Sequence, residues 1–253
     1  VDNLKADYYD DFADYLTEVV KYYRDNYGVT FRTLDPVNEP NTNYWGANGR
    51  QEGCHFDVAS QEKIIKETYN KLSEKGLLPQ GSTPGTSISA MDETSIDLCL
   101  SNLKSYSAET LALISQVNTH TYGGSKRAEL NAYVKSIGKK LWMSEVGIGG
   151  SVGHDHNSMN PGMALASKIT SDVTALGAEA WVYWQVVEDE ANMLPSAENS
   201  NWGLIHADFD RVNENFYLTK QFYVMGNYSR FIRPGYKFIE SGNSKTVAAY
   251  DGV

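Results

Sequence analysis

Two glutamates stand where strand-like, apolar runs of the sequence end. Glu39 lies in Asp-Pro-Val-Asn-Glu-Pro at residues 35–40, after a β-prone run over residues 29–34, and its flanking prolines stiffen the backbone. Glu145 ends the run Leu-Trp-Met-Ser-Glu at residues 141–145 and precedes a glycine-rich segment. Each could be structural, Glu39 as a cap or surface carboxylate and Glu145 as an ion-pair partner. Two carboxylates with no metal ligand between them are the groups needed to cleave a glycosidic bond.

Other strand-like runs end in side chains that could serve the same site. His120 and Tyr122 close the run around residues 116–121, and Trp184 closes the run 180–184. Tyr122 is a plausible hydrogen-bond donor to a buried carboxylate, whereas a lone histidine at a strand end is more often structural. Trp45 and Trp184 are the candidates for aromatic faces on which a sugar could stack.

The elements that must position these residues follow an alternating pattern. Helical periodicity predicts helices over residues 8–23, 58–75, 95–114, 128–137, 159–176 and 216–228, and β-prone runs predict strands over residues 29–34, 78–82, 116–121, 140–144 and 180–184. Strands separated by helices indicate an α/β protein with a parallel sheet. The five strands fit an open doubly wound sheet or part of an eight-stranded barrel. We favour the barrel, because no Gly-x-Gly-x-x-Gly or Gly-Lys-Ser/Thr phosphate loop follows any strand.

A parallel barrel would bring the two glutamates together. The carboxyl ends of its strands share one rim, where such barrels keep their active sites. Glu39, Glu145, His120, Tyr122 and Trp184 all follow or end predicted strands and would therefore converge there. A nucleotide- or phosphate-binding α/β protein is the alternative from another class, but no lysine follows the glycine segment and Glu145 would repel a phosphate.

The composition of the chain excludes several classes of binding partner. The 253 residues carry a formal net charge of −10, which argues against nucleic acid. No apolar run approaches the roughly 20 residues that would span a bilayer, so we expect no membrane partner. The two cysteines, Cys54 and Cys99, cannot form a disulfide framework, and free thiols are favoured over a single bridge. We expect a monomer that acts on a polysaccharide or oligosaccharide.

The sequence predicts no metal and no cofactor. His-Asp-His at residues 154–156 resembles a metal-binding triplet, but an i, i+2 pair in a loop is weak evidence for a site. The acidic run Glu-Asp-Glu at residues 188–190 is interpreted as a solvated loop, with calcium as a distant alternative.

Several motifs together resemble glycoside hydrolase family 30, of clan A. They are Asn38-Glu39-Pro40, Tyr44-Trp45, Gln51-Glu52-Gly53-Cys54, Trp142-Met143-Ser144-Glu145-Val146-Gly147 and Phe231-Ile232-Arg233-Pro234-Gly235-Tyr236. Within the family, the stretch from Asn41 to Phe56 is most similar to endo-β-1,6-galactanases. The resemblance covers nearly the whole chain.

This resemblance implies a (β/α)8 barrel with a side β-sandwich and hydrolysis with retention of configuration. Glu39 would be the acid/base and Glu145 the nucleophile. Asn38 would lie near the sugar 2-hydroxyl, Tyr122 would hydrogen-bond Glu145, and His120 would line the same cleft.

The resemblance also implies that barrel strands one to three are missing. We expect strands 4 to 8 of the barrel over residues 1–232, the beginning of the sandwich over residues 233–253, and a fragment of a longer, secreted, extracellular gene product. Other specificities of the family remain open, namely β-1,6-glucanase, xylanase or glucosylceramidase-like activity. A non-catalytic carbohydrate-binding fragment is the alternative outside catalysis.

Overall fold

The computed structural model describes residues 3–46, 48, 51, 53–150, 152–209 and 215–253. Glu52 of the motif at residues 51–54 lies outside this part of the chain. Two compact units divide the chain, residues 1–142 and residues 143–253. Within the described residues, every helix is too short or too polar to cross a membrane.

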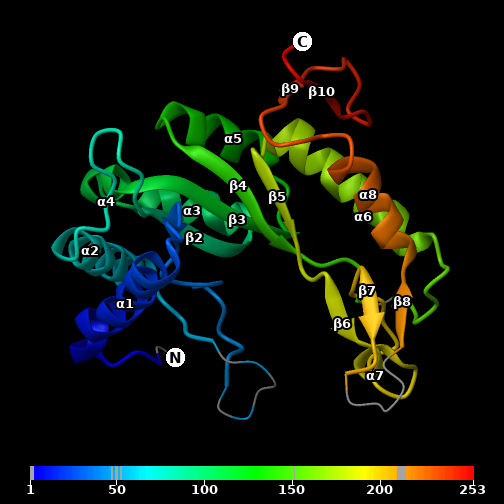
Figure 1. Cartoon of the computed structure of the whole chain (residues 1–253), viewed down its shortest axis with the longest axis horizontal. Coiled ribbons are helices and arrows are strands. Elements are labelled where there is room, and N and C mark those ends of the chain that lie inside the picture. The colour runs from blue at the N-terminus through cyan, green and yellow to red at the C-terminus, as the bar shows by residue number, and fades with distance from the viewer. Residues whose placement is uncertain (1–2, 47, 49–50, 52, 151, 210–214) are drawn as a thin grey trace. The chain divides into compact units, whose positions relative to one another are not determined.

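The first unit alternates helices and strands (Figure 1). Its elements are the 3₁₀ turn η1 (Ala6–Tyr8), α1 (Tyr9–Tyr27), β1 (Thr33–Leu34), α2 (Val58–Glu74), β2 (Ser87–Ser95), α3 (Ile96–Ser105), α4 (Ala108–Leu113), β3 (Ile114–Gly123) and α5 (Arg127–Ser136). The next strand, β4 (Lys140–Val146), contains the boundary between the two units.

The order of the strands in the sheet decides between the two sheet types that the sequence left open. β1 pairs with β2 and β2 with β3, both in parallel. The five-stranded sheet runs in the order β1-β2-β3-β4-β5, where β5 is Ala180–Tyr183. A doubly wound sheet reverses its strand order at a switch point, whereas a barrel adds each strand next to the last. The sequential order is that of part of a barrel.

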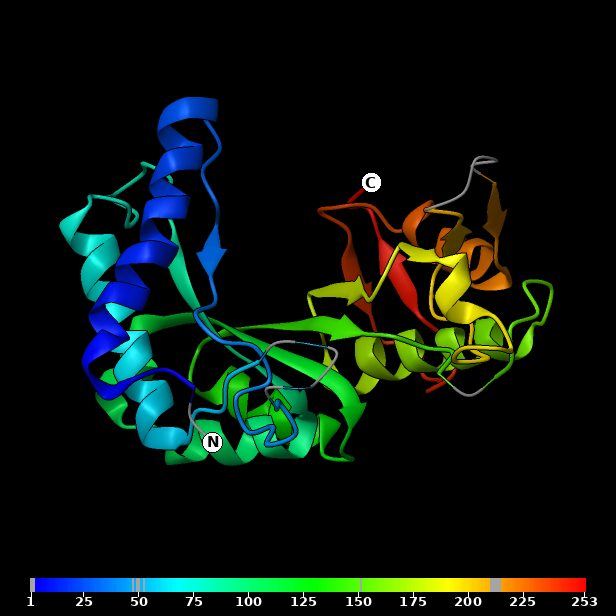
Figure 2. The same ribbon diagram turned by 90° about the horizontal axis from the view of Figure 1, so that it is seen from below.

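A small core fixes the segment that leads from β1 toward Glu39. α1 and α2 lie side by side (Figures 1 and 2). The core cluster between and beside them consists of Tyr9, Ala13, Val37, Phe56 and Ile64. Several large apolar residues of α1 face outward, since Tyr15, Val19 and Tyr23 are exposed. The buried residues of α1 are Tyr9, Ala13, Thr17 and Val20.

The second unit begins within β4. Its further elements are α6 (Asn160–Ser171), the π-helical turn η2 (Asp172–Leu176), β5, β6 (Val187–Asp189), α7 (Glu190–Met193), β7 (Ile205–Ala207), β8 (Phe216–Leu218), α8 (Lys220–Ser229), β9 (Lys237–Ile239) and β10 (Ala248–Tyr250). β6, β7 and β8 form a separate three-stranded sheet, and β9 pairs with β10 in an antiparallel hairpin. α6 packs against α8 through a core that includes Leu165, Tyr183 and Val224.

The strand expected over residues 78–82 is wrong. That stretch is a turn, in which Gln80 and Thr83 exchange backbone hydrogen bonds, and its Pro79 and Gly81 fit a turn better than a strand. The strand in this place is β2, whose sequence Ser-Ile-Ser-Ala-Met-Asp-Glu-Thr-Ser has few β-branched residues and two acids. The expected helix over residues 216–228 is also shorter, since residues 216–218 form β8 and Thr219 caps α8.

Candidate active site

Glu39 lies beyond the carboxyl end of β1 in a tightly held turn. Its φ is +46°, a left-handed conformation that a non-glycine residue seldom adopts. Its N–H donates to the carbonyl of Asp92 at 2.8 Å, and its own carbonyl accepts from the N–H and the hydroxyl of Thr42. Strain of this kind persists only where surrounding bonds fix it, and it is common at functional sites.

The carboxylate of Glu39 is buried, with 6% of the residue exposed, and each of its oxygens has a partner. The Tyr44 hydroxyl donates to Oε2 at 2.9 Å, and Nδ1 of His120 lies 3.2 Å from Oε1. Burial acts to raise the pKa of Glu39, but the hydrogen bonds from His120 and Tyr44 outweigh it, and the pKa is lowered. Within the first unit the site therefore favours an ionised Glu39.

His120 lies between two acidic residues. The ring is 1% exposed, and its Nε2 is 3.7 Å from Oδ1 of Asp92 while its Nδ1 faces Glu39. Asp92, Glu39 and His120 lie in or beyond the carboxyl-terminal halves of β2, β1 and β3. The structure therefore places His120 beside Glu39 and Asp92. The sequence did not single out Asp92, because β2 was misplaced.

A second buried acid stands beside this group. Glu93 is fully buried and accepts hydrogen bonds from the Thr94 N–H at 3.0 Å and the Asn102 amide at 3.1 Å. Burial raises the pKa of Glu93, and the negative charge of Glu39 adds to the effect. The Asn102 amide also donates to Oδ1 of Asn41 at 2.6 Å, which links Glu93 to the segment that follows Glu39.

Glu145 belongs to the second unit and is the sixth residue of the seven-residue strand β4. The next residue, Val146, accepts a hydrogen bond at its carbonyl from the N–H of Trp184, at 3.0 Å. Trp184, which follows β5, is 48% exposed. The structure thus brings the ends of β4 and β5 together, with Glu145 and Trp184 at that end.

The glycines that follow Glu145 are required by close packing. A Cβ on Gly147 would lie 2.7 Å from the Trp184 carbonyl and 2.8 Å from the Trp202 ring. Gly149 has φ +126°, and a Cβ there would overlap the Asn201 carbonyl. Trp202 therefore covers the glycine segment, and Trp184 is the more open of the two indoles.

The remaining predicted site residues differ in their surroundings. Asn38 is exposed next to Glu39. Trp45 is half-buried, with its ring centroid 4.6 Å from that of Tyr44 and its indole packed on Gly53. Tyr122 is 38% exposed, and its ring meets the His120 ring edge-on at 6.0 Å. The first unit therefore gathers these residues around Glu39, and Tyr44 is an addition that only the structure identifies as a Glu39 partner.

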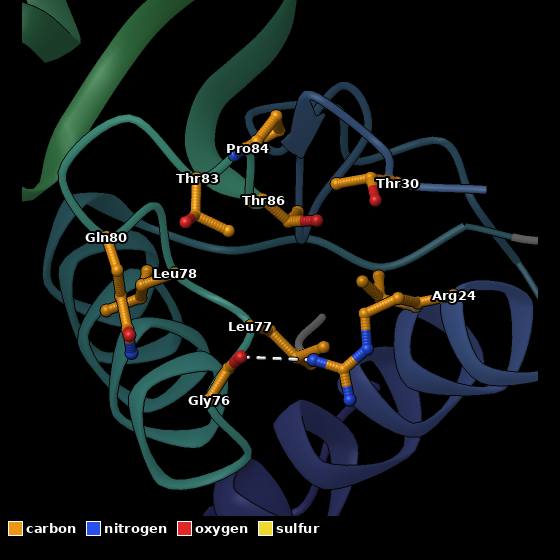
Figure 3. Close-up of a pocket in the computed structure, with 11 residues that line it drawn as sticks. Arg24, Thr30, Gly76, Leu77, Leu78, Gln80, Thr83, Pro84 and Thr86 are labelled. Carbon is orange, nitrogen blue, oxygen red and sulfur yellow. Dashed lines mark hydrogen bonds between the residues drawn. The ribbon is translucent and has the colours of Figure 1, made fainter. Parts of the chain in front are cut away.

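A pocket of about 140 Å³ in the first unit lies at the other end of the strands (Figure 3). Its wall includes Thr30, which precedes β1, and the stretch from Thr83 to Thr86, which precedes β2. Nη1 of Arg24 donates to the Gly76 carbonyl there at 3.0 Å. The amino-terminal end of barrel strands generally serves stability, so this pocket is separate from the Glu39 site.

Both cysteines are free thiols, as the sequence favoured. Cys99 is buried, and burial raises the pKa of its thiol well above the ordinary value, which makes the thiol a poor nucleophile. Cys54 accepts a hydrogen bond from the Asn3 N–H.

Two relatives of known activity match most of this chain. An endo-β-1,6-galactanase of Hypocrea rufa is 30% identical over 99% of the chain and 47% of its own length. An exo-β-1,6-galactobiohydrolase of Bifidobacterium longum subsp. longum is 28% identical over 79% of the chain and 16% of its own length. The chain thus spans about half or less of the length of these relatives.

The fold is similar to that of a solved glycosidase domain. The catalytic domain of the GH30 xylanase C from Talaromyces cellulolyticus superimposes with a TM-score of 0.65, at 20% identity, over 92% of this chain and 48% of that one. The model of O-glycosyl hydrolase family 30 matches residues 1–192, which contain Glu39, β4 with Glu145, and β5. This chain belongs to O-glycosyl hydrolase family 30.

Proposed function

We propose that the protein is a retaining, endo-acting hydrolase of β-1,6-galactan, such as the side chains of arabinogalactan. The observation that carries the proposal is the buried, doubly hydrogen-bonded Glu39 at the carboxyl end of a parallel strand, in a chain of this family. The similarity to an endo-β-1,6-galactanase over nearly the whole chain supports the substrate class. A polymeric substrate of this kind is met outside the cell, so we place the protein there.

In the proposed reaction Glu145 is the nucleophile and Glu39 is the acid/base. Glu145 attacks the anomeric carbon while Glu39 protonates the departing glycosidic oxygen, which gives a galactosyl ester on Glu145 and a free sugar chain. Glu39, now ionised, then removes a proton from water, and the water oxygen displaces Glu145. Two inversions at the anomeric carbon leave the β-configuration unchanged.

For this role Glu39 must hold a proton before the first step. The hydrogen bonds from Tyr44 and His120 lower its pKa, so a further influence must act in the opposite direction. A second ionised carboxylate nearby and a bound sugar that excludes water both raise the pKa of a carboxyl group. We expect Glu145 to be this second carboxylate and the bound galactan to exclude the water, so that both raise the pKa of Glu39.

The other site residues bind the sugar or orient the carboxylates. We propose that Asn38 hydrogen-bonds the 2-hydroxyl, a contact that strengthens as charge develops on the ring. Tyr122 would donate to Glu145 and keep it ionised, while His120 positions Glu39. Trp45 and Trp184 would offer aromatic faces to neighbouring sugars.

Substitution of each carboxylate tests the proposal. We expect Glu39→Gln and Glu145→Gln each to lower hydrolysis of β-1,6-galactan by at least about 10²- to 10⁴-fold. An aryl β-galactoside, whose leaving group needs no proton, separates the roles. It should still release its aryl group in a burst with Glu39→Gln, whereas Glu145→Gln should release none. Glu179→Gln, on an exposed side chain, is the matched control and should keep full activity.

A panel of β-1,6-galactan, β-1,6-glucan and xylan separates the specificities. Release of oligosaccharides only from the glucan or the xylan would replace the galactanase assignment by another specificity of the family. Binding of galactan without any release of sugar would identify a carbohydrate-binding protein instead. Equal activity of Glu39→Gln and Glu179→Gln would exclude the proposed role of Glu39.

A further inference from the structure

Four potential metal ligands, none of them a residue of the proposed hydrolase site, meet in the second unit. His154 and His156 lie between β4 and α6, Glu190 is the first residue of α7, and His206 is the middle residue of β7. One candidate ligand atom of each lies within 4.8 Å of those of the others. Three of the five histidines of the chain are therefore gathered around one carboxylate.

All three imidazoles direct a ring nitrogen at Glu190. Nε2 of His154 is 2.6 Å from Oε1, Nε2 of His156 is 3.2 Å from Oε2, and Nδ1 of His206 is 3.0 Å from Oε2. The ring centroid of His156 lies 4.7 Å from that of His154 and 4.9 Å from that of His206. Nitrogens from two segments, the loop between β4 and α6 and the strand β7, converge on the carboxylate of α7 and form a compact shell of nitrogen and oxygen donors.

The donor set matches one class of ion. Zn²⁺ holds imidazole nitrogen and carboxylate oxygen at about 2.0–2.2 Å in a tetrahedron, which places ligand atoms about 3.4 Å apart. The present separations need adjustments of about an ångström to reach that arrangement. Imidazole ligands favour zinc and its transition-metal neighbours, whereas calcium and magnesium prefer oxygen.

The protein already holds the cluster in shape. The Lys220 N–H donates to the His156 carbonyl at 3.1 Å, and the Asn201 amide donates to the Asp155 carbonyl at 3.0 Å. The Tyr217 ring stacks on His156 with centroids 4.7 Å apart and planes 8° apart. His206 is fully buried, and the side chains of His154 and His156 are 22% and 19% exposed. An ion could therefore enter past the two outer rings.

We propose that His154, His156, Glu190 and His206 bind one Zn²⁺ ion, which joins the segment that follows Glu145 to α7 and β7. Four protein ligands leave no open position on a tetrahedral ion, so the role of this ion is structural. The ion would fix the course of the segment after β4 through residues on two other elements. The inference does not depend on the proposed hydrolase activity.

Metal binding by the full chain tests this site directly. The protein is stripped with a chelator, dialysed, and titrated with zinc chloride by calorimetry, with metal content measured by mass spectrometry. We expect one equivalent of Zn²⁺. Co²⁺ in its place should give the intense visible absorption of a tetrahedral site. His154→Gln and His206→Gln should each weaken Zn²⁺ binding by about 100-fold or more, because each removes a direct ligand.

The control is His55→Gln, which removes a histidine outside the cluster and should leave the affinity for Zn²⁺ unchanged. Circular dichroism without metal shows whether each variant folds. If His206→Gln does not fold, the test rests on His154→Gln, which replaces a partly exposed ring. Zn²⁺ should raise the melting temperature of the parent protein and of His55→Gln, but not of His154→Gln. The proposal is overturned by less than about a tenth of an equivalent bound, or by equal affinity in His154→Gln and the parent. Either result would leave a metal-free hydrogen-bonded cluster.

Discussion

Besides His120, Tyr44 is a hydrogen-bond donor that lowers the pKa of Glu39. Its hydroxyl lies 2.9 Å from Oε2, and a donor to the ionised form of a carboxyl group lowers the pKa of that group. Tyr44 is largely exposed, although its hydroxyl reaches a buried carboxylate. The motif that contains Tyr44 was recognised in the sequence, but its partner was not.

Tyr44→Phe should therefore raise the pKa of Glu39. If Glu39 is the acid, loss of its proton sets the alkaline limb of the kcat/KM profile, and this limb should move to higher pH in the variant. The acidic limb, which reports the nucleophile, should stay in place. Tyr27→Phe alters an exposed tyrosine of α1 and serves as control. An alkaline limb that stays in place or moves to lower pH in Tyr44→Phe would contradict this role.

At the scale of elements, the α1–α2 pair supports the turn that carries Glu39. Ile64 of α2 is fully buried and shares a core cluster with Tyr9 of α1 and with Val37, two residues before Glu39. Truncation of such a side chain removes apolar contacts and leaves a cavity. The same change on an exposed helix face has little effect.

We expect Ile64→Ala to lower the free energy of unfolding by about 2–5 kcal/mol, measured by urea denaturation. Val19→Ala on the exposed face of α1 should change it by about 0.5 kcal/mol or less. Because Val37 belongs to the same cluster, Ile64→Ala should also lower kcat more than it alters KM. Equal destabilisation by both variants would show that this cluster is not the core that joins α1 to α2.

At the scale of the whole molecule, each compact unit carries one of the two glutamates. Glu39 lies in residues 1–142 and Glu145 in residues 143–253, while the strand β4 contains the boundary. Residues that act in one reaction lose activity in a non-additive way when substituted together. The two glutamates should behave as a single catalytic group despite their separate units.

The double variant Glu39→Gln/Glu145→Gln should therefore have nearly the same activity as the less active of the two single variants. Combining Glu39→Gln with Glu179→Gln gives the additive reference. A crystal structure should show the Glu39 and Glu145 carboxyl groups about 5 Å apart, and NMR should show the β-anomer as the first product. A separation of about 6.5–9.5 Å with an α-anomeric product would indicate inversion instead.

Much of the local structure could be predicted from the sequence. The helical periodicity over residues 58–75 corresponds to α2 (Val58–Glu74), and the apolar runs over residues 116–121 and 140–144 lie within β3 and β4. These signals are local, because a helix or strand that buries one face shows it in the spacing of its apolar residues. β2 was not predicted, because a strand buried on both faces needs no alternation of apolar and polar residues. This strand also carries small and acidic residues.

The α/β class, the two glutamates at strand ends and the motifs of the family can be read from the order of the residues. Which side chains meet depends on how the chain folds in three dimensions. Asp92 reaches His120 because β2 and β3 are neighbours in the sheet, and Glu190 meets His154 and His206 across 36 and 16 residues of chain. Spacing along the chain shows which face of an element a residue occupies. The course of the connecting segments and the pairing of strands decide what that face contacts.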